Sequence, residues 1–270
     1  MNKESKPIGI FDSGIGGLTV LKELRKKLPY ENTVYLGDTA RVPYGTRSPE
    51  TVTRYSFENT RFLFSKEVKM IVVACNTASS VSLDSIRNAA PVPFVGVIEP
   101  GAKAAAAATK NRKIGVIGTE ATIKSNSYSQ AIRRIDSSIE VFGIACPLFV
   151  PLVEEGWTDC KIAEMIAQEY LQEIRRKGID TLVLGCTHYP LLKGVLATVM
   201  GEDVKLIDSA IETALEIETI LKNLSLLNTS GGNIKEFFVT DSPDKFKTVG
   251  EIFLGEHIHD IKKIELEMEV

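Results

Sequence analysis

Short apolar runs alternate with longer amphipathic segments along almost the whole chain, and this alternation restricts the possible folds more than any other feature. The runs Ile8–Phe11, Met70–Ala74 and Thr181–Leu184 consist almost entirely of apolar residues and glycine. Strands that are apolar on both faces are typical of parallel sheets covered by helices on each side. The chain is therefore predicted to be an α/β protein built on parallel sheets.

The pattern occurs twice, which predicts two lobes. A strand followed by Cys75–Thr77 in the first half corresponds to a strand followed by Cys186–His188 in the second half. We expect two pseudo-symmetric, doubly wound α/β lobes whose parallel-type sheets face a central cleft. The first lobe is predicted to comprise residues 1–98 plus 208–270 and the second lobe residues 99–207, so that the tail after residue 207 returns to the first lobe.

Periodicity and turn residues give the expected element boundaries. Helices are expected at 16–28, 49–66, 79–89, 101–109, 125–135, 159–177 and 209–222. Further strands are expected at 33–36, 94–97, 113–117, 140–144, 204–207 and 236–240, with a loop at 223–235 and a β-like tail at 262–270.

Composition indicates which classes of protein to exclude. The 270 residues are 44% hydrophobic and 25% charged, the balance of a soluble globular protein, and the net charge of −3 carries no basic surplus for nucleic acid. No run of about 18 apolar residues predicts a membrane span, and no apolar segment at the start predicts a signal peptide. The four cysteines include no Cys-x-x-Cys pair, so we expect free thiols in a reducing cytoplasm rather than disulfides.

Ligands of open α/β sheets bind outside the carboxyl ends of the strands. In this chain those ends are followed by Asp12-Ser13, by Asp38, by Cys75–Thr77, by Thr119 and by Cys186–His188. If the lobes face each other, both cysteines point towards one crevice. One thiolate can then remove a proton from a small ligand while the other thiol supplies one from the opposite side, which inverts a stereocentre.

The residue types suit that chemistry. A thiol with an ordinary pKa of about 8.5 can alternate between thiol and thiolate near neutral pH. Asn76, Thr77 and Thr187 can donate hydrogen bonds to a substrate carboxylate and so stabilise the carbanion that forms. Asp12 and His188 are placed to assist as bases, one on each side.

Simpler interpretations exist for each feature. Cys146 and Cys160 are expected to be packing residues, and Asp38 could cap the segment that follows it. The glycine-rich turn after Asp12 could bind phosphate, but it lacks the Walker lysine and the dinucleotide spacing. Cys186 and His188 could ligate a metal, yet no further ligand pair with zinc spacing is present, and no metal is expected.

An ordered set of motifs resembles the glutamate racemase family. The resemblance spans roughly residues 8–208, and its stretches are 9–18 (GIFDSGIGGL), 35–45 (YLGDTARVPYG), 73–79 (VACNTAS), 96–101 (GVIEPG), 146–156 (CPLFVPLVEEG) and 184–190 (LGCTHYP). It implies a cytoplasmic isomerase, independent of any cofactor, that supplies D-glutamate for peptidoglycan synthesis, cell-wall biogenesis and cell shape. It also implies a homodimer. The lack of an extension at the start implies no activation by a cell-wall precursor.

The resemblance also implies roles for single residues. Cys75 resembles the residue that deprotonates the D-isomer and Cys186 its counterpart for the L-isomer. Asp12 and His188 resemble the assisting groups, with Glu154 near the second thiol. The substrate-binding pairs are implied to be Asp12-Ser13, Tyr44-Gly45, Asn76-Thr77 and Thr187-His188.

Three other functions remain open from the sequence. A related two-cysteine racemase or isomerase could act on aspartate, a hydantoin or a maleate-type acid. A binding protein could hold a small anion without turning it over, although binding alone does not need two thiols. Some relatives also inhibit a DNA-handling enzyme, and the acidic balance of this chain permits that role without indicating it.

Overall fold

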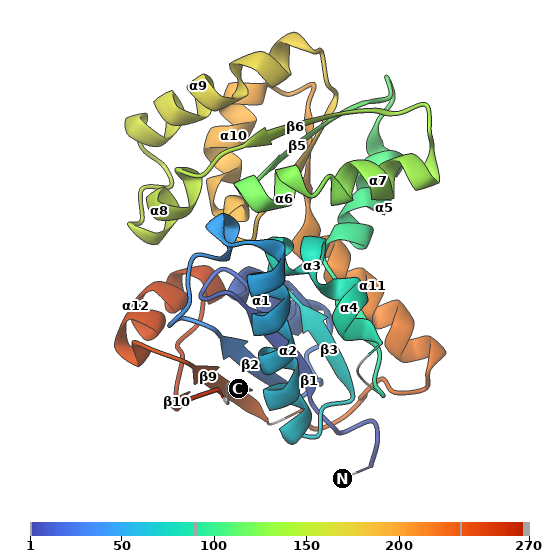
Figure 1. Cartoon of the computed structure of the whole chain (residues 1–270), viewed down its shortest axis with the longest axis vertical. Helices are drawn as coiled ribbons and strands as arrows, with labels where there is room; N and C mark the ends of the chain where they lie inside the picture. Colours follow the sequence, from blue (N-terminus) through green and yellow to red (C-terminus); the bar gives the residue numbers. More distant parts are fainter. Residues whose placement is uncertain (1, 89–90, 233, 267–270) are drawn as a thin grey trace.

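Two α/β lobes, each built on a parallel sheet, make up the computed structural model, which describes residues 2–88, 91–232 and 234–266 (Figure 1). The larger sheet has the strand order β10-β9-β2-β1-β3-β4 and the smaller sheet the order β6-β5-β7-β8. The strands are β1 (Ile8–Asp12), β2 (Thr33–Gly37), β3 (Met70–Val73), β4 (Phe94–Gly96), β5 (Lys113–Gly118), β6 (Glu140–Ala145), β7 (Thr181–Gly185), β8 (Lys205–Asp208), β9 (Lys235–Val239) and β10 (Ile261–Lys263).

The two sheets repeat one topology, which confirms the expected pair of parallel α/β lobes. The order β2-β1-β3-β4 in the first sheet is the order β6-β5-β7-β8 in the second. Strands β3 and β7 therefore occupy equivalent positions, and each is followed within two residues by a thiol, Cys75 or Cys186. Strand β9 extends the first sheet alongside β2, and β10 pairs with β9 at the edge of the same sheet.

The apolar strands are buried on both faces, as the sequence predicts. Ile8 and Ile10 of β1 pack in one cluster with Leu21, whereas Phe11 packs in another with Leu63. Alternate residues of a strand point to opposite faces, so helices must cover each side. Each such side chain stabilises the fold by about 1.5–3 kcal/mol on burial.

Several helices differ from the sequence prediction. The helices are α1 (Leu18–Lys27), α2 (Pro49–Ser65), α3 (Asn76–Val81), α4 (Leu83–Arg87), α5 (Ile98–Ala108), α6 (Glu120–Lys124), α7 (Ser127–Ile135), α8 (Phe149–Glu154), α9 (Lys161–Arg176), α10 (Lys193–Met200), α11 (Ser209–Asn223) and α12 (Pro243–Leu254), with 3-10 turns η1 (Tyr44–Thr46) and η2 (Tyr189–Leu192). The sequence prediction omitted α6, α8, α10 and α12.

The helix predicted at 79–89 is wrong in its start and in its continuity. Helix α3 begins directly after Cys75, because the Cys75 sulfur accepts a hydrogen bond from the Ala78 N–H and caps the first turn. The helix is interrupted at Ser82, whose hydroxyl donates to the carbonyl of Ala78. Residue 89 of that prediction, like residues 267–270 of the predicted tail and residue 233 of the predicted loop, lies outside the described residues.

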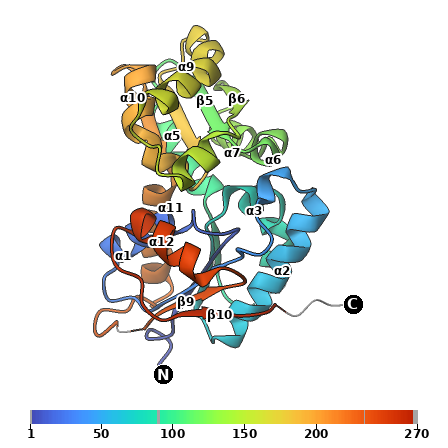
Figure 2. The ribbon, with the colours of Figure 1, turned by 90° about the vertical axis from the view of Figure 1, so that its left-hand side faces the viewer.

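The lobes are joined by packing as well as by the chain. Helix α11 contacts α1 in the first lobe and α5 at the start of the second, and Figure 2 shows it starting near the junction of the lobes and continuing alongside the first lobe. Thr19 of α1 donates a buried hydrogen bond of 2.9 Å to the carbonyl oxygen of Thr187, beside the second thiol. No helix within the described ranges is long and apolar enough to span a bilayer.

Candidate active site

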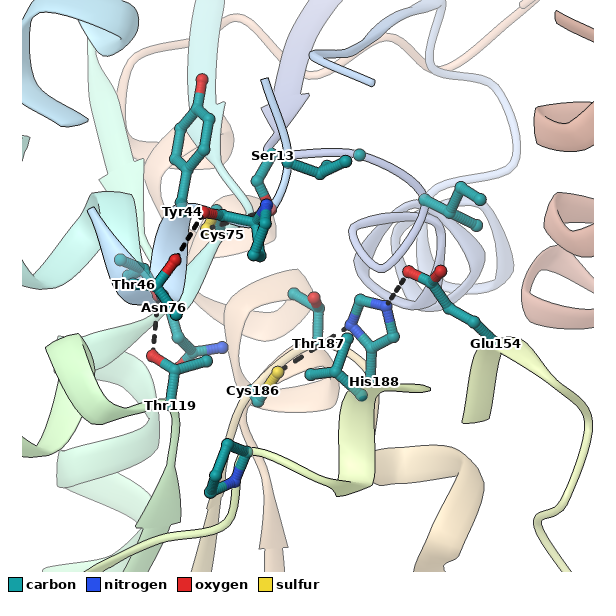
Figure 3. Close-up of a pocket in the computed structure, with 18 of the residues that line it drawn as sticks. Ser13, Tyr44, Thr46, Cys75, Asn76, Thr119, Glu154, Cys186, Thr187 and His188 are labelled. Carbon is teal, nitrogen blue, oxygen red and sulfur yellow. Dashed lines mark hydrogen bonds and ion pairs between the residues drawn. The ribbon is translucent and has the colours of Figure 1, made fainter. Parts of the chain in front are cut away.

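A cavity of about 330 Å³ lies between the lobes and receives side chains from both (Figure 3). All residues predicted for the site line it except Asp12. They are Ser13, Tyr44, Gly45, Cys75, Asn76, Thr77, Glu154, Cys186, Thr187 and His188.

Sequence reasoning missed part of the lining. The lining also includes Thr119, which follows β5 and was noted as a strand-end residue, and the further residues Gly14, Ile15, Val42, Pro43, Thr46, Glu120, Pro147, Val150 and Pro151. Most of these residues are chain neighbours of predicted ones. Extending the predicted pairs by one or two residues would have found Gly14, Ile15, Val42, Pro43 and Thr46, but not Pro147, Val150 and Pro151.

The first thiol sits at the mouth of β3 with two hydrogen-bonding neighbours. Cys75 is buried, and its sulfur lies 3.5 Å from the N–H of Ala78 and 3.7 Å from Oγ of Ser13. Burial and the negative charge of Asp12 raise the pKa of Cys75 to about 12, although the Ala78 and Ser13 hydrogen bonds oppose the increase. In this state Cys75 is a protonated thiol that can donate a proton.

The second thiol belongs to a chain of three groups. Sγ of Cys186 lies 3.8 Å from Nδ1 of His188, and Nε2 of His188 lies 3.2 Å from Oε1 of Glu154. Burial lowers the pKa of His188, but the interactions with Cys186, Glu154 and Asp12 outweigh it and raise this pKa to about 10. The imidazolium therefore places a positive charge beside the sulfur of Cys186.

Helix α12 of the first lobe supports this chain of groups. Nζ of Lys245 lies 3.6 Å from Oε2 of Glu154, and the ring of Phe253 packs edge-on against His188 with centroids 5.2 Å apart. The hydrogen bond from His188 lowers the pKa of Glu154 in spite of its burial, and Lys245 adds to this effect. Glu154 is thus an anion that fixes the orientation of the imidazolium.

The raised pKa of His188 predicts a pH dependence of stability. The folded-state pKa of about 10 exceeds the ordinary value of 6.5, so the stabilisation by the charged ring is complete below pH 6.5 and is lost as pH rises through 10. We expect the free energy of unfolding of the wild type to fall over this window by more than that of His188→Asn. Urea unfolding at pH 6, 8 and 10 measures the difference, and parallel curves would contradict the assignment.

Asp12 lies beneath the glycine-rich turn rather than at the cavity surface. Its side chain is fully buried, Oδ2 accepts a hydrogen bond of 2.8 Å from the Gly14 N–H, and Oδ1 has no hydrogen-bond partner. Burial raises the pKa of Asp12, whereas the charge of His188 and the N–H groups of Gly14 and Gly17 oppose this. Ser13, its neighbour in the chain, reaches the cavity instead.

The glycine-rich turn approaches the second lobe so closely that a side chain would not fit. A Cβ on Gly16 would lie 2.6 Å from Nδ1 of His188 and would overlap Oγ1 of Thr187. We expect Gly16→Ala to distort the cavity and to destabilise the fold by about 1–3 kcal/mol.

A matched glycine provides the control for this substitution. Gly194 lies in helix α10, and a Cβ added there would meet no atom within 4 Å, so Gly194→Ala should stabilise the protein by about 0.5–1 kcal/mol. Thermal unfolding and activity of both variants test the prediction. Wild-type activity in Gly16→Ala would show that the turn is not tightly packed against His188.

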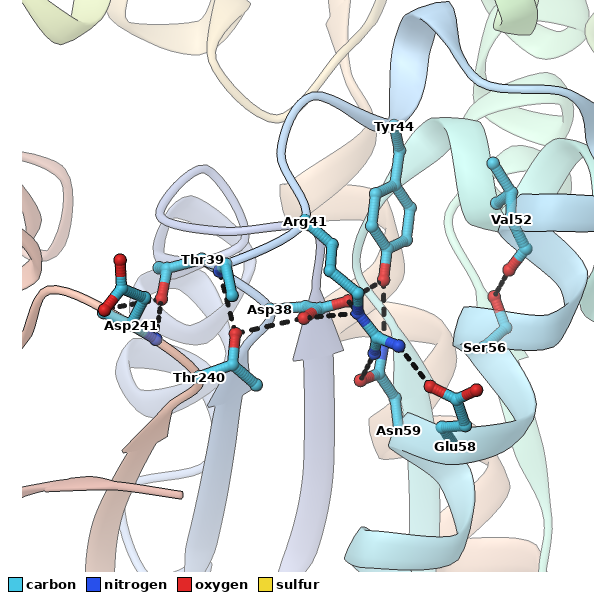
Figure 4. Close-up of polar contacts among 11 residues, drawn as sticks. Asp38, Thr39, Arg41, Tyr44, Val52, Ser56, Glu58, Asn59, Thr240 and Asp241 are labelled. Atoms are coloured by element: carbon cyan, nitrogen blue, oxygen red, sulfur yellow. Dashed lines mark hydrogen bonds and ion pairs between the residues drawn. The ribbon is translucent and has the colours of Figure 1, made fainter. Parts of the chain in front are cut away.

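A buried polar network holds the loop that carries Tyr44 (Figure 4). Nε of Arg41 lies 2.7 Å from Oδ2 of Asp38, and Oγ1 of Thr240 donates to Oδ1 of Asp38 at 3.0 Å. The hydroxyl of Tyr44 donates to Asp38 and accepts from Nδ2 of Asn59 at 3.1 Å. The suggestion that Asp38 merely caps the following segment is therefore wrong, because its carboxylate is occupied by these side chains.

The network predicts that Asp38→Asn disturbs the cavity from a distance. Burial raises the pKa of Asp38 in spite of the nearby Arg41. The neutral amide of an asparagine at position 38 would leave the guanidinium of Arg41 with Glu58 as its only anionic partner among the groups of this network. We expect a loss of about 2 kcal/mol in stability and a higher KM. Glu236→Gln, which affects an exposed pair with Lys262, is the matched control and should change neither quantity appreciably. Equal effects of the two substitutions would contradict this role of Asp38.

The remaining cysteines are outside the cavity. All four thiols are free. Cys146 is fully buried, as expected for a packing residue, whereas the same expectation for Cys160 is wrong because Cys160 is exposed at the start of α9. Within the described part of the chain, no cluster of three or more His, Cys, Asp or Glu side chains is placed to hold a metal ion.

The fold and the cavity define a two-lobed α/β enzyme with one thiol from each lobe at a shared site. The model of the Asp/Glu/Hydantoin racemase family matches residues 17–217. The curated glutamate racemase of Geobacter metallireducens is 56% identical over 265 residues, which cover 98% of each chain. The chain therefore belongs to the Asp/Glu/Hydantoin racemase family and is an isomerase.

Solved structures agree with this assignment. The glutamate racemase isoform RacE1 from Bacillus anthracis superposes with a TM-score of 0.94 at 42% identity, covering 97% of this chain and 98% of that chain. The glutamate racemase from Francisella tularensis, solved in complex with D-glutamate, gives a TM-score of 0.92 at 41% identity, covering 98% of this chain and 99% of that chain.

Proposed function

We propose that this chain interconverts L- and D-glutamate without a cofactor, using Cys75 and Cys186 as two acid–base groups. The observation that carries the proposal is the pair of thiols, which follow equivalent strands of two lobes and line one cavity. The substrate is inferred from similarity to glutamate racemases, one of which was solved with D-glutamate bound.

The reaction needs only a proton transfer on each face of the α-carbon. In the L-to-D direction the Cys186 thiolate takes the α-proton, and the C–H electron pair remains on the α-carbon as a carbanion. The Cys75 thiol then donates its proton to the opposite face and becomes the thiolate. The reverse direction exchanges the two roles, and the pKa of about 12 of Cys75 suits a group that holds its proton in the resting enzyme.

Assisting groups return each thiol to its starting state. His188, with its orientation fixed by Glu154, can exchange a proton with Cys186 across 3.8 Å. On the other side Asp12 acts on Cys75 electrostatically, and burial raises the pKa of Asp12 so that it can accept a proton more readily than an ordinary carboxylate. The two carboxylates therefore have different roles, one as a base and the other as a fixed anion.

Hydrogen-bond donors in the cavity stabilise the carbanion. Asn76 Nδ2 is buried and has no hydrogen-bond partner in the protein, which leaves its N–H groups for a ligand. Thr77 and Thr187 line the same cavity from opposite lobes. Donors directed at the substrate carboxylate bind it more strongly as negative charge develops there in the transition state.

We further propose a cellular role and an organisation for the enzyme. D-glutamate made in the cytoplasm, where thiols stay reduced, would serve peptidoglycan synthesis. The lobes are proposed to comprise residues 1–98 plus 208–270 and residues 99–207. The first lobe would then supply three of the predicted substrate-binding pairs, and the second lobe would supply Thr187-His188. The homodimer implied by the sequence stays a prediction that size-exclusion chromatography with light scattering would test.

Circular dichroism of purified, reduced protein with L-glutamate tests the activity. We expect the optical signal of L-glutamate to decay to zero, and that of L-aspartate to stay constant under the same conditions. Added pyridoxal phosphate or a chelator should change neither result. Decay with L-aspartate alone would assign the related substrate, and a constant signal with both amino acids would favour a binding role.

A further inference from the structure

Tyr128 lies at the point where the two thiol-bearing turns approach each other, although the mechanism above does not use it. It belongs to α7 of the second lobe and is 2% exposed. Its hydroxyl lies 2.7 Å from Oδ1 of Asn76, the residue that follows Cys75 in the first lobe. This contact is therefore a hydrogen bond between the lobes next to the first thiol.

The contact determines which end of the Asn76 amide faces a ligand. An asparagine amide has an acceptor oxygen and a nitrogen that carries two donors. The Tyr128 hydroxyl occupies Oδ1, while Nδ2 is buried without a partner in a residue that lines the cavity (Figure 3). If the amide were reversed, it would present an acceptor oxygen, which repels a carboxylate.

The phenol is arranged to act as the donor in this hydrogen bond. Burial raises the pKa of Tyr128 and keeps the phenol protonated, while a hydrogen bond from Ser209 opposes this increase. An amide oxygen can only accept a hydrogen bond, so the phenol donates its proton to Oδ1 of Asn76. Ser209 begins helix α11 and its hydroxyl donates to the carbonyl oxygen of Leu184 at 3.5 Å, so the phenol lies beside the connection between the lobes.

The ring of Tyr128 packs against the turn that carries the second thiol. A Cβ on Gly185, the residue before Cys186, would lie 3.1 Å from Cε2 of Tyr128. A Cβ on Gly101 of α5 would lie 3.3 Å from Cε1 on the other edge of the ring. Tyr128 thus lies against Asn76, which follows Cys75, and against Gly185, which precedes Cys186.

We propose that Tyr128 is a positioning residue. It fixes the Asn76 amide with its nitrogen towards the substrate and keeps the turns of Cys75 and Cys186 in a constant position relative to each other. The inference rests on the proposed racemisation of glutamate. Tyr128 lies outside the cavity, yet by this inference it determines whether Asn76 presents a hydrogen-bond donor or an acceptor to the ligand.

The test compares Tyr128→Phe with Tyr189→Phe. Each substitution removes one buried hydroxyl, and Tyr189 donates to the carbonyl of Cys146 at 2.9 Å without lining the cavity. We expect kcat/KM for glutamate to fall about tenfold in Tyr128→Phe, the effect of losing one hydrogen bond at the transition state. Tyr189→Phe should stay within about twofold of the wild type while losing similar thermal stability.

A double-mutant cycle separates positioning from general damage to the fold. In the Asn76→Ala background there is no amide to orient, so Tyr128→Phe should change kcat/KM by less than about twofold. The same tenfold loss in both backgrounds, or wild-type activity of Tyr128→Phe, would overturn the inference.

A second variant covers the case in which Tyr128→Phe fails to fold. Ser209→Ala removes the hydroxyl that interacts with the phenol and should lower kcat/KM by about threefold in the wild type and not at all in Asn76→Ala. Equal losses in both backgrounds would overturn the inference. An inactive wild type would overturn the proposed function together with this inference, whereas an active wild type with unaffected variants would overturn the inference alone.

Discussion

Alanine at either Cys75 or Cys186 is expected to lower kcat for glutamate racemisation by about a thousandfold or more, in both directions. Each thiol serves as the base in one direction and as the acid in the other, so removal of either one blocks both. Positioned acid–base groups contribute about 10²–10⁴-fold to rates. Steady-state assays that start from each isomer measure the loss, and near-full turnover by either variant would exclude the two-thiol mechanism.

Three further variants separate thiol chemistry from packing. Serine at position 75 can still accept the Ala78 hydrogen bond that caps α3, yet it lacks an ionisable thiol and should be as inactive as alanine. Cys160→Ala removes an exposed thiol and Cys146→Ala a buried one, both outside the cavity. Both controls should retain turnover, with lower thermal stability only for Cys146→Ala.

Asparagine at His188 is expected to lower kcat about a hundredfold. The imidazolium lies 3.8 Å from the Cys186 sulfur, and an amide supplies neither its charge nor its proton. Because the enzyme cannot change the equilibrium between the two isomers, kcat/KM must fall equally in both directions. The loss should be largest below pH 10, where the wild-type ring is charged.

His257 provides the matched control for this substitution. It is exposed, contacts Glu251 and lies outside the cavity, so His257→Asn should leave kcat unchanged. Activity of His188→Asn within threefold of the wild type across pH 6–10 would contradict the role of His188.

Much of the fold could be predicted because its local signals agree with the tertiary structure. Strands β3 and β7 are apolar runs that end in a thiol, and their equivalent places in two sheets follow from that repetition. Helix α12 was missed although Phe246, Gly250, Phe253 and Leu254 are buried at helical spacing, because charged residues interrupt the pattern. Helix α8 is short and contains Pro151, so its sequence carries little periodicity.

The residues of the candidate site could be predicted where they belong to one local motif. The contacts that join residues of different lobes could not be predicted. Ser13, Tyr44 and Thr187, which belong to predicted motifs, line the cavity. The contacts of Lys245 with Glu154 and of Tyr128 with Asn76 join residues far apart in the chain. No local pattern records such contacts, since they depend on how the two lobes pack. The burial of Asp12 beneath its own turn is likewise a tertiary property.

The most direct test of the two-thiol account is racemisation of D-glutamate in deuterium oxide, with the α-hydrogen of each isomer followed by NMR from the first turnovers. Two acid–base groups predict that the L-glutamate formed carries deuterium while the remaining D-glutamate still carries protium. Protium retained in the L-glutamate product, or equal deuterium in both isomers from the start, would show that one group serves both faces and would contradict the account.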